Sequence, residues 1–124
     1  MNAERDDVRQ RIVATGFGII KLSHIQSVMD QQHAEGTWHY AVLYDFRDAT
    51  TSVTGDDMWS LASHVQGLGP MTRGPVAVVA TDPAFYGVAR MYSMMTDRAG
   101  LRFAVFRDRA DAERWLDEQQ QVRG

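Results

Sequence analysis

The sequence predicts an α/β fold with the element order β-β-α-β-α-β-α-β-α, that is, a five-stranded mixed sheet and four helices. Two apolar runs, residues 40–46 and 75–80, have the length and composition of strands that are buried on both faces. A segment with apolar residues at helical spacing follows each run, and strands that alternate with helices favour parallel pairing through right-handed crossovers. We therefore expect the last three strands to be parallel.

The first two strands are predicted at residues 8–14 and 18–22, where β-branched residues are frequent. The intervening Thr15, Gly16 and Phe17 are interpreted as the turn of an antiparallel hairpin. Residues 1–7 are polar and charged, so we expect a flexible N-terminus ahead of one domain over residues 8–122.

The first two helices are predicted from their caps and their apolar stripes. The first begins at Ser23, with Gln26 three residues later as in a capping box, and Gly36 ends it. The second begins near Thr54, with Asp57 in the corresponding position.

The third and fourth helices are predicted to start at aspartate caps. Asp82 precedes a proline, which suits the first helical position, and this helix runs over residues 83–98 until Gly100 stops it. Residues 101–106 form the last strand, and Asp108 caps the final helix.

Composition excludes several classes of protein. The chain has 124 residues, of which 44% are hydrophobic and 23% charged, as in an ordinary globular domain. It contains no cysteine, which excludes disulfides, thiolate metal ligands and cysteine nucleophiles. The formal net charge is -3 with both signs dispersed, which argues against nucleic-acid binding. No apolar run reaches about 18 residues, so we expect a cytoplasmic chain without membrane insertion.

Several short sequence segments resemble those of the SpoIIAA-like family. Its members are small bacterial proteins with the β-α superhelix of STAS and CRAL-TRIO lipid-transfer domains. The segments lie at residues 44–50, 85–92, 105–108 and 112–116, and the resemblance spans residues 9–116. It implies the same superhelix. It is specific for fold rather than for activity, because most members of the family are uncharacterised.

The STAS relatives that antagonise anti-sigma factors are phosphorylated by a partner kinase on a serine or threonine directly after the aspartate that ends a central strand. Asp45 matches that aspartate, but Phe46 and Arg47 follow it, so the phosphoacceptor is absent from this position. The hydroxyl residues of the next few positions are Thr50, Thr51, Ser52 and Thr54. Each is a candidate either for helix capping or for modification.

Charged residues end the predicted parallel strands, at the edge where ligands bind in sheets of this kind. Asp45, Arg47 and Arg107 lie there, and Arg90 is expected to reach the same edge from the third helix. Guanidinium groups bind carboxylate or phosphate, so this set predicts a carrier for a small anionic or amphiphilic, lipid-like ligand. The apolar walls would be Phe46, Phe85 and Phe106. Alternatively, the arginines pair with neighbouring aspartates and only close helix ends.

The third helix carries a second candidate surface. Tyr86, Arg90 and Met94 are spaced four residues apart and form a ridge outside the apolar stripe. Trp59 also lies off the stripe of its own helix. These residue types are enriched in interface cores, so we expect a homodimer or a regulatory protein partner at this ridge. The alternative is that Tyr86 and Met94 pack beneath a neighbouring element.

No catalytic constellation is present in the sequence. The histidines at positions 24, 33, 39 and 64 lack metal-ligand spacing, and neither a Gly-x-Ser-x-Gly elbow nor a phosphate-binding loop occurs. We therefore expect no catalytic residue, no metal and no cofactor. The leading interpretation is a non-enzymatic regulatory or protein-interaction domain, and the alternative is the carrier described above.

Overall fold

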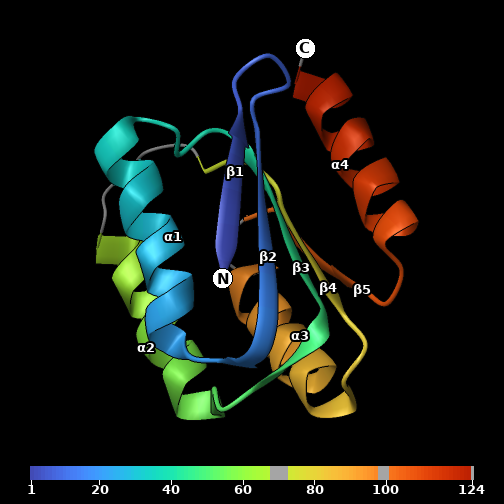
Figure 1. Cartoon of the computed structure of the whole chain (residues 1–124). Coiled ribbons are helices and arrows are strands. Elements are labelled where there is room, and N and C mark those ends of the chain that lie inside the picture. The colour runs from blue at the N-terminus through green and yellow to red at the C-terminus, as the bar shows by residue number, and fades with distance from the viewer. Residues whose placement is uncertain (68–72, 98–100, 124) are drawn as a thin grey trace.

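The computed structural model describes residues 1–67, 73–97 and 101–123, and these form a twisted sheet with helices on both faces (Figure 1). The expected order of elements is confirmed. The elements are β1 (Asn2–Asp6), β2 (Arg11–Ile20), α1 (Leu22–Glu35), β3 (Ala41–Thr51), α2 (Gly55–Gly67), β4 (Val76–Ala80), α3 (Pro83–Asp97), β5 (Phe103–Phe106) and α4 (Arg109–Arg123).

The strands follow one another across the sheet in the order β1-β2-β3-β4-β5. β1 pairs with β2 in antiparallel orientation, and the other three pairs are parallel. The parallel part therefore includes the last three strands, as expected, and extends to β2 as well. The helix α1 makes this possible. It connects β2 to β3 and carries the chain back to the end of the sheet at which β2 begins, so that β3 runs in the same direction as β2.

The two faces of the sheet have separate apolar cores. Helices α1, α2 and α3 cover one face and α4 covers the other (Figure 1). Successive residues of a strand point to opposite faces, so Tyr44 and Phe46 of β3 join the core beneath α1–α3 while Leu43 packs toward α4. Leu116 and Ala112 are the buried α4 residues of this second core.

The N-terminal hairpin lies earlier in the chain than predicted. Residues 2–6, expected to be flexible, form β1, which pairs with β2 from Arg11 to Thr15. The turn occupies residues 7–10, where the carboxylate of Asp6 accepts a hydrogen bond of 3.0 Å from the backbone N–H of Arg9. A short acidic side chain that caps a turn in this way stabilises the reversal without a glycine.

Gly16 is therefore not a turn residue but lies within the continuous strand β2. The pairing with β3 shifts register between Thr15 and Phe17, which is a bulge. A Cβ atom at Gly16 would lie 2.7 Å from side-chain atoms of both Ile20 and Phe46, so the absence of a side chain lets the core close over the strand.

Three of the four predicted helix caps are confirmed. Thr54 and Asp57 cap α2 reciprocally, since each side chain accepts a hydrogen bond from the backbone N–H of the other. The Asp82 carboxylate accepts from the backbone N–H of Phe85 at 2.9 Å, and Asp108 accepts from the backbone N–H of Ala110 at 2.7 Å. These caps fix the starts of α2, α3 and α4.

The start of α1 differs from the prediction. Its N-cap is Lys21 rather than Ser23, and the backbone N–H of Lys21 donates to Nδ1 of His24 at 3.0 Å. The histidine ring nitrogen thus fills the role predicted for a glutamine oxygen. The other end agrees with the sequence, because Gly36 ends the helix in the left-handed conformation with φ of 71°.

Candidate functional site

Asp45 lies at the centre of the predicted anion site, and its carboxylate is already fully engaged. It is 4% exposed. Its Oδ1 atom accepts hydrogen bonds from Nε of Arg47 at 2.9 Å and from the Arg47 backbone N–H at 3.2 Å. Its Oδ2 atom accepts from Nη2 of Arg47 at 2.8 Å and from Nη1 of Arg109 at 3.0 Å. Two guanidinium groups therefore share one buried carboxylate.

This cluster is an internal ion-pair network that joins β3 to the first turn of α4. Burial raises the pKa of Asp45, but the hydrogen bonds from Arg47 and Arg109 outweigh burial and lower the pKa overall, so the carboxyl is ionised at neutral pH. Arg109 also pairs with Glu113 at 3.3 Å. For Arg47, the geometry agrees with the alternative in which the predicted arginines bind neighbouring acids rather than a ligand. Arg109 was not among the predicted residues, because no local pattern relates it to Asp45.

The other predicted members of the anion site do not gather around Asp45. The guanidinium of Arg107 stacks on the ring of Tyr86, 4.5 Å from its centroid. Arg90 is exposed on α3, and no ion pair between described residues joins it to the strand ends. The predicted ligand residues therefore do not form one site: Arg47 pairs with Asp45, Arg107 packs on Tyr86, and Arg90 is exposed.

The three residues predicted to form the apolar walls of the ligand site lie on two different faces of the sheet. Phe46 and Phe85 stack with ring centroids 4.7 Å apart beneath α1–α3. Phe106 lies on the opposite face, where its ring packs against Trp115 of α4 at 6.0 Å. Two of the three walls thus belong to one apolar layer.

Helices α2 and α3 contact each other, and each carries a large exposed apolar residue. A Cβ atom at Gly55 would lie 3.2 Å from the terminal methyl of Met91, so this flank of α2 faces α3. Trp59 stands one helical turn after Gly55 on the same flank and is 63% exposed. Met94 stands one turn after Met91 and is 61% exposed. We call Trp59, Met91 and Met94 the α2–α3 seam.

The predicted interface ridge is only partly exposed. Met94 and Arg90 are exposed, and Trp59 is exposed as the sequence indicated. Tyr86 is half-buried, packs against the core and is covered by Arg107, which is the alternative stated for it. The exposed part of the predicted ridge is therefore Arg90 and Met94, without Tyr86.

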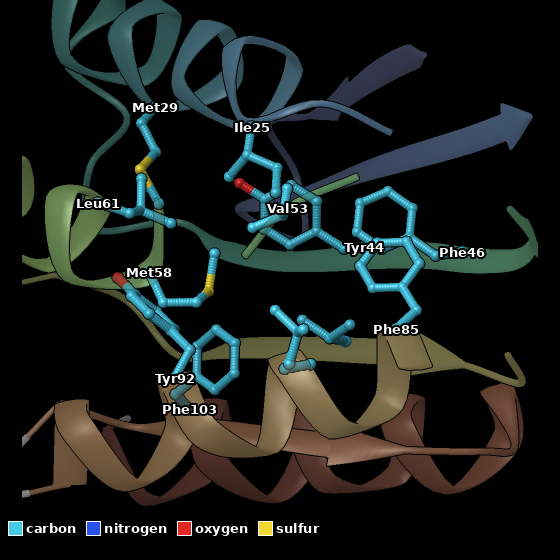
Figure 2. Close-up of a pocket in the computed structure, with 13 residues that line it drawn as sticks. Ile25, Met29, Tyr44, Phe46, Val53, Met58, Leu61, Phe85, Tyr92 and Phe103 are labelled. Atoms are coloured by element: carbon cyan, nitrogen blue, oxygen red, sulfur yellow. The ribbon is translucent and has the colours of Figure 1, made fainter. Parts of the chain in front are cut away.

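A small apolar cavity lies between the sheet and helices α1, α2 and α3 (Figure 2). Its volume is about 40 Å³, and its walls include Met29, Met58, Leu61 and the stacked Phe46 and Phe85. A drug-sized ligand occupies roughly 300 Å³ or more, so the closed cavity has room only for a few atoms. Two methionines in its wall are flexible enough to enlarge it by changing rotamer.

Two polar side chains, Tyr44 and Arg73, lie close to each other, and Tyr44 lines the cavity. Tyr44 is 3% exposed, and its hydroxyl has no hydrogen-bond partner among the described residues. Burial raises the pKa of this hydroxyl to about 12. Arg73 lies nearby with its guanidinium 4.1 Å from the centroid of the Trp38 ring, and its Nη1 atom is also unpartnered in the described part of the chain. Burial lowers the pKa of Arg73, while Tyr44 and Tyr92 act in the opposite direction.

Comparisons with known proteins bear on the fold. No family model matches the sequence, and no curated protein matches it. A solved structure is similar over 93% of this chain and 90% of its own chain, with a TM-score of 0.57 and 16% sequence identity. It is an uncharacterised protein of the DUF3478 family with a SpoIIAA-like fold from Shewanella loihica PV-4. The fold is SpoIIAA-like. A likeness at 16% identity supports this fold alone and carries no activity with it.

In this SpoIIAA-like fold, the four hydroxyl residues at the end of β3 and just after it include two with side-chain hydrogen bonds and two that are exposed. The Thr51 hydroxyl donates to the carbonyl oxygen of Ile20 at 2.8 Å and accepts from the backbone N–H of Val53 at 3.0 Å. Thr54 caps α2. Thr50 and Ser52 are exposed. Two of the four predicted modification candidates thus have structural roles.

Residues 1–67, 73–97 and 101–123 contain no group of three or more histidine or acidic side chains that suits a metal ion. Within the same ranges, no helix has the length and apolarity needed to cross a membrane.

Proposed function

We propose that this SpoIIAA-like chain is a non-enzymatic interaction domain that forms a homodimer through the α2–α3 seam. The observation that carries the proposal is the exposure of Trp59, at 63%, and of Met94, at 61%, on two helices that contact each other at Gly55 and Met91. Tryptophan and methionine are enriched in interface cores, and burying a large exposed aromatic contributes much of the binding energy of many interfaces.

Charges beside the seam favour a second copy of the chain as its occupant. Asp56 is exposed on α2, one turn before Trp59, and Arg90 is exposed on α3, one turn before Met94. A two-fold interface brings the same patch of both copies together, so it must be self-complementary. A patch that carries both a carboxylate and a guanidinium at its rim meets this condition. A regulatory role follows if a partner protein competes with the second copy for the same seam.

Sedimentation velocity tests this proposal. We expect a wild-type dimer, and we expect Trp59→Ala combined with Met94→Ala to weaken dimerisation by about 30-fold or more, as for loss of a hot spot. The matched control is Phe17→Ala combined with Ile19→Ala, because these β2 side chains are equally exposed but distant in the chain from the seam. A seam variant that dimerises like the wild type would refute the assignment.

The second candidate is a carrier for a small anionic or amphiphilic ligand. The cavity beneath α1–α3 favours it, because two of the predicted walls, Phe46 and Phe85, line this cavity together with Tyr44 (Figure 2). The Tyr44 hydroxyl has no hydrogen-bond partner among the described residues. The ligand site is then inside the α1–α3 layer rather than at Arg47 and Arg107.

A further inference from the structure

The outer edge of β5 carries backbone groups that face no other strand. β5 lies at the end of the sheet opposite β1, and in the described part of the chain it pairs only with β4. The backbone N–H of Val76 in β4 donates to the carbonyl oxygen of Arg102 at 2.9 Å. The N–H and C=O of one strand residue point to the same edge, and those of the next residue point to the opposite edge. Phe103 and Val105 therefore present their N–H and C=O groups away from β4.

The two outer edges of the sheet differ in how they are protected from further pairing. β1 contains Glu4, Arg5 and Asp6, all exposed, and charged side chains on an edge strand discourage another strand from adding there. β5 has the sequence Phe-Ala-Val-Phe, with no charge and no proline, and each of its residues is partly exposed. An apolar edge of this kind is a template for strand addition. The edge of β5 is therefore the one open to a partner.

Side chains on both faces of β5 would contact an added strand. Tyr92 of α3 packs against Phe103 with ring centroids 5.0 Å apart, and Trp115 of α4 packs against Phe106 with centroids 6.0 Å apart. The next strand of a sheet lies about 5 Å away, so its side chains would pack beside the apolar residues of β5 on either face. A segment that binds here therefore has apolar side chains at its centre.

Arginines at both ends of β5 favour an acidic segment over a second copy of the chain. Arg102 directly precedes β5, and Arg107 directly follows it and is exposed. The neighbouring Asp108 directs its carboxylate to the backbone of α4. Two copies that pair antiparallel along β5 would bring Arg102 of one copy to the end that carries Arg107 of the other, so like charges would meet at both ends. Carboxylates at the ends of an added segment would instead complement them.

We propose that the outer edge of β5 binds an extended segment of a partner protein, which adds to the sheet through the backbone groups of Phe103 and Val105. The segment has apolar side chains beside β5 and carboxylates at its two ends. Because only Phe103 and Val105 turn outward, it makes about four backbone hydrogen bonds, and we expect weak, reversible binding. None of these residues belongs to the α2–α3 seam, so the inference stands whether or not the seam forms a dimer.

Amide hydrogen exchange, followed by NMR on the isotopically labelled wild-type chain at pH 7, tests the proposal. The probe is a peptide with blocked ends, Glu-Glu-Val-Thr-Val-Thr-Glu-Glu, in large excess. We expect exchange at Phe103 and Val105 to slow by about tenfold or more, because their N–H groups gain acceptors. Exchange at Ala104, whose N–H points toward β4, should change less. A peptide with lysine in place of each glutamate should bind several-fold more weakly.

Two substitutions at one position separate backbone pairing from side-chain packing. Val105→Pro removes the outward N–H and leaves in place the groups that point toward β4, whereas Val105→Ala shortens the same side chain and keeps the N–H. We expect proline to abolish peptide binding and alanine to retain it within a few-fold. Should Val105→Pro not fold, Arg107→Glu tests the charges, because it should weaken binding of the acidic peptide and strengthen binding of the lysine peptide. The matched control is Lys21→Glu, at an exposed residue after β2, which should change neither.

Three results would overturn the proposal. Unchanged exchange at Phe103 and Val105 in excess acidic peptide would show that this edge does not accept the segment. Equal affinity for the two peptides, unaltered by Arg107→Glu, would refute an acidic partner. If Val105→Pro dissociates an oligomer that persists when Trp59 and Met94 are replaced by alanine, β5 pairs with a second copy of the chain rather than with a partner segment.

Discussion

Replacing Asp45 by asparagine tests whether the ion-pair network is a structural tie between β3 and α4. The side chain accepts four hydrogen bonds from Arg47 and Arg109. A hydrogen bond to a charged group contributes about 1.5 to 3 kcal/mol. The side chains of Arg47 and Arg109 are 48% and 33% exposed, so water replaces much of what they lose. We therefore expect a total loss of about 2 to 3 kcal/mol, well below the sum of separate bonds.

For a domain of this length, that loss lowers Tm by about 8 to 12 °C. Thermal unfolding followed by circular dichroism measures it, with Asp48→Asn as the control. Asp48 is an exposed carboxylate on the same strand, so its substitution should change stability by less than about 0.5 kcal/mol. Equal melting temperatures for the two variants would refute the argument that the buried carboxylate holds β3 to α4.

The same pair of proteins predicts a dependence on pH. The pKa of Asp45 in the folded chain is lowered below its usual value of 3.8. Its contribution to stability is therefore fully present above that value and is lost as the pH falls through the folded-state pKa. The difference in stability between the wild type and Asp45→Asn should be constant near neutral pH and shrink below about pH 4. A difference that grows on acidification would contradict the assigned direction of the shift.

Three further substitutions test the fold by thermal unfolding. Thr54→Ala removes one half of the reciprocal cap with Asp57 and should cost about 1 kcal/mol, whereas Ser60→Ala on the exposed side of α2 should be nearly neutral. Gly74→Ala should destabilise by about 3 kcal/mol or more, because a Cβ there would overlap the carbonyl oxygens of His39 and Tyr40. Gly87→Ala should instead stabilise by about 0.5 to 1 kcal/mol, since its Cβ would meet nothing within 4 Å and alanine favours the helix. A normal melting temperature for Gly74→Ala would contradict the close approach at that position.

Local signals in the sequence predicted most of the fold. Asp82 and Asp108 act as caps through bonds to residues two or three positions away, so their neighbours in the sequence carry the necessary information. The buried strands were recognisable from continuous apolar runs for the same reason. The hairpin was misplaced because a glycine in a sequence is consistent either with a turn or with a close approach of core side chains. Only the positions of Ile20 and Phe46 in the folded chain show that Gly16 is the second case.

The candidate sites were harder to predict because their contacts join residues that are distant in sequence. Asp45 was singled out from its place at a strand end, but its partner Arg109 lies on α4 and has no signature in the sequence. Arg11 is a similar case, because it is buried against Asp117 of α4 at 2.7 Å. Arg73 carries no local signal either, since its surroundings of Trp38, Tyr44 and Tyr92 assemble only in the folded chain.

Native mass spectrometry of the purified wild-type chain tests the interaction-domain proposal most directly, because it reports both oligomeric state and any bound mass. The proposal predicts a dimer of bare chains at low micromolar concentration, which becomes a monomer when Trp59 and Met94 are replaced by alanine. A wild-type chain that stays monomeric as its concentration is raised would contradict it.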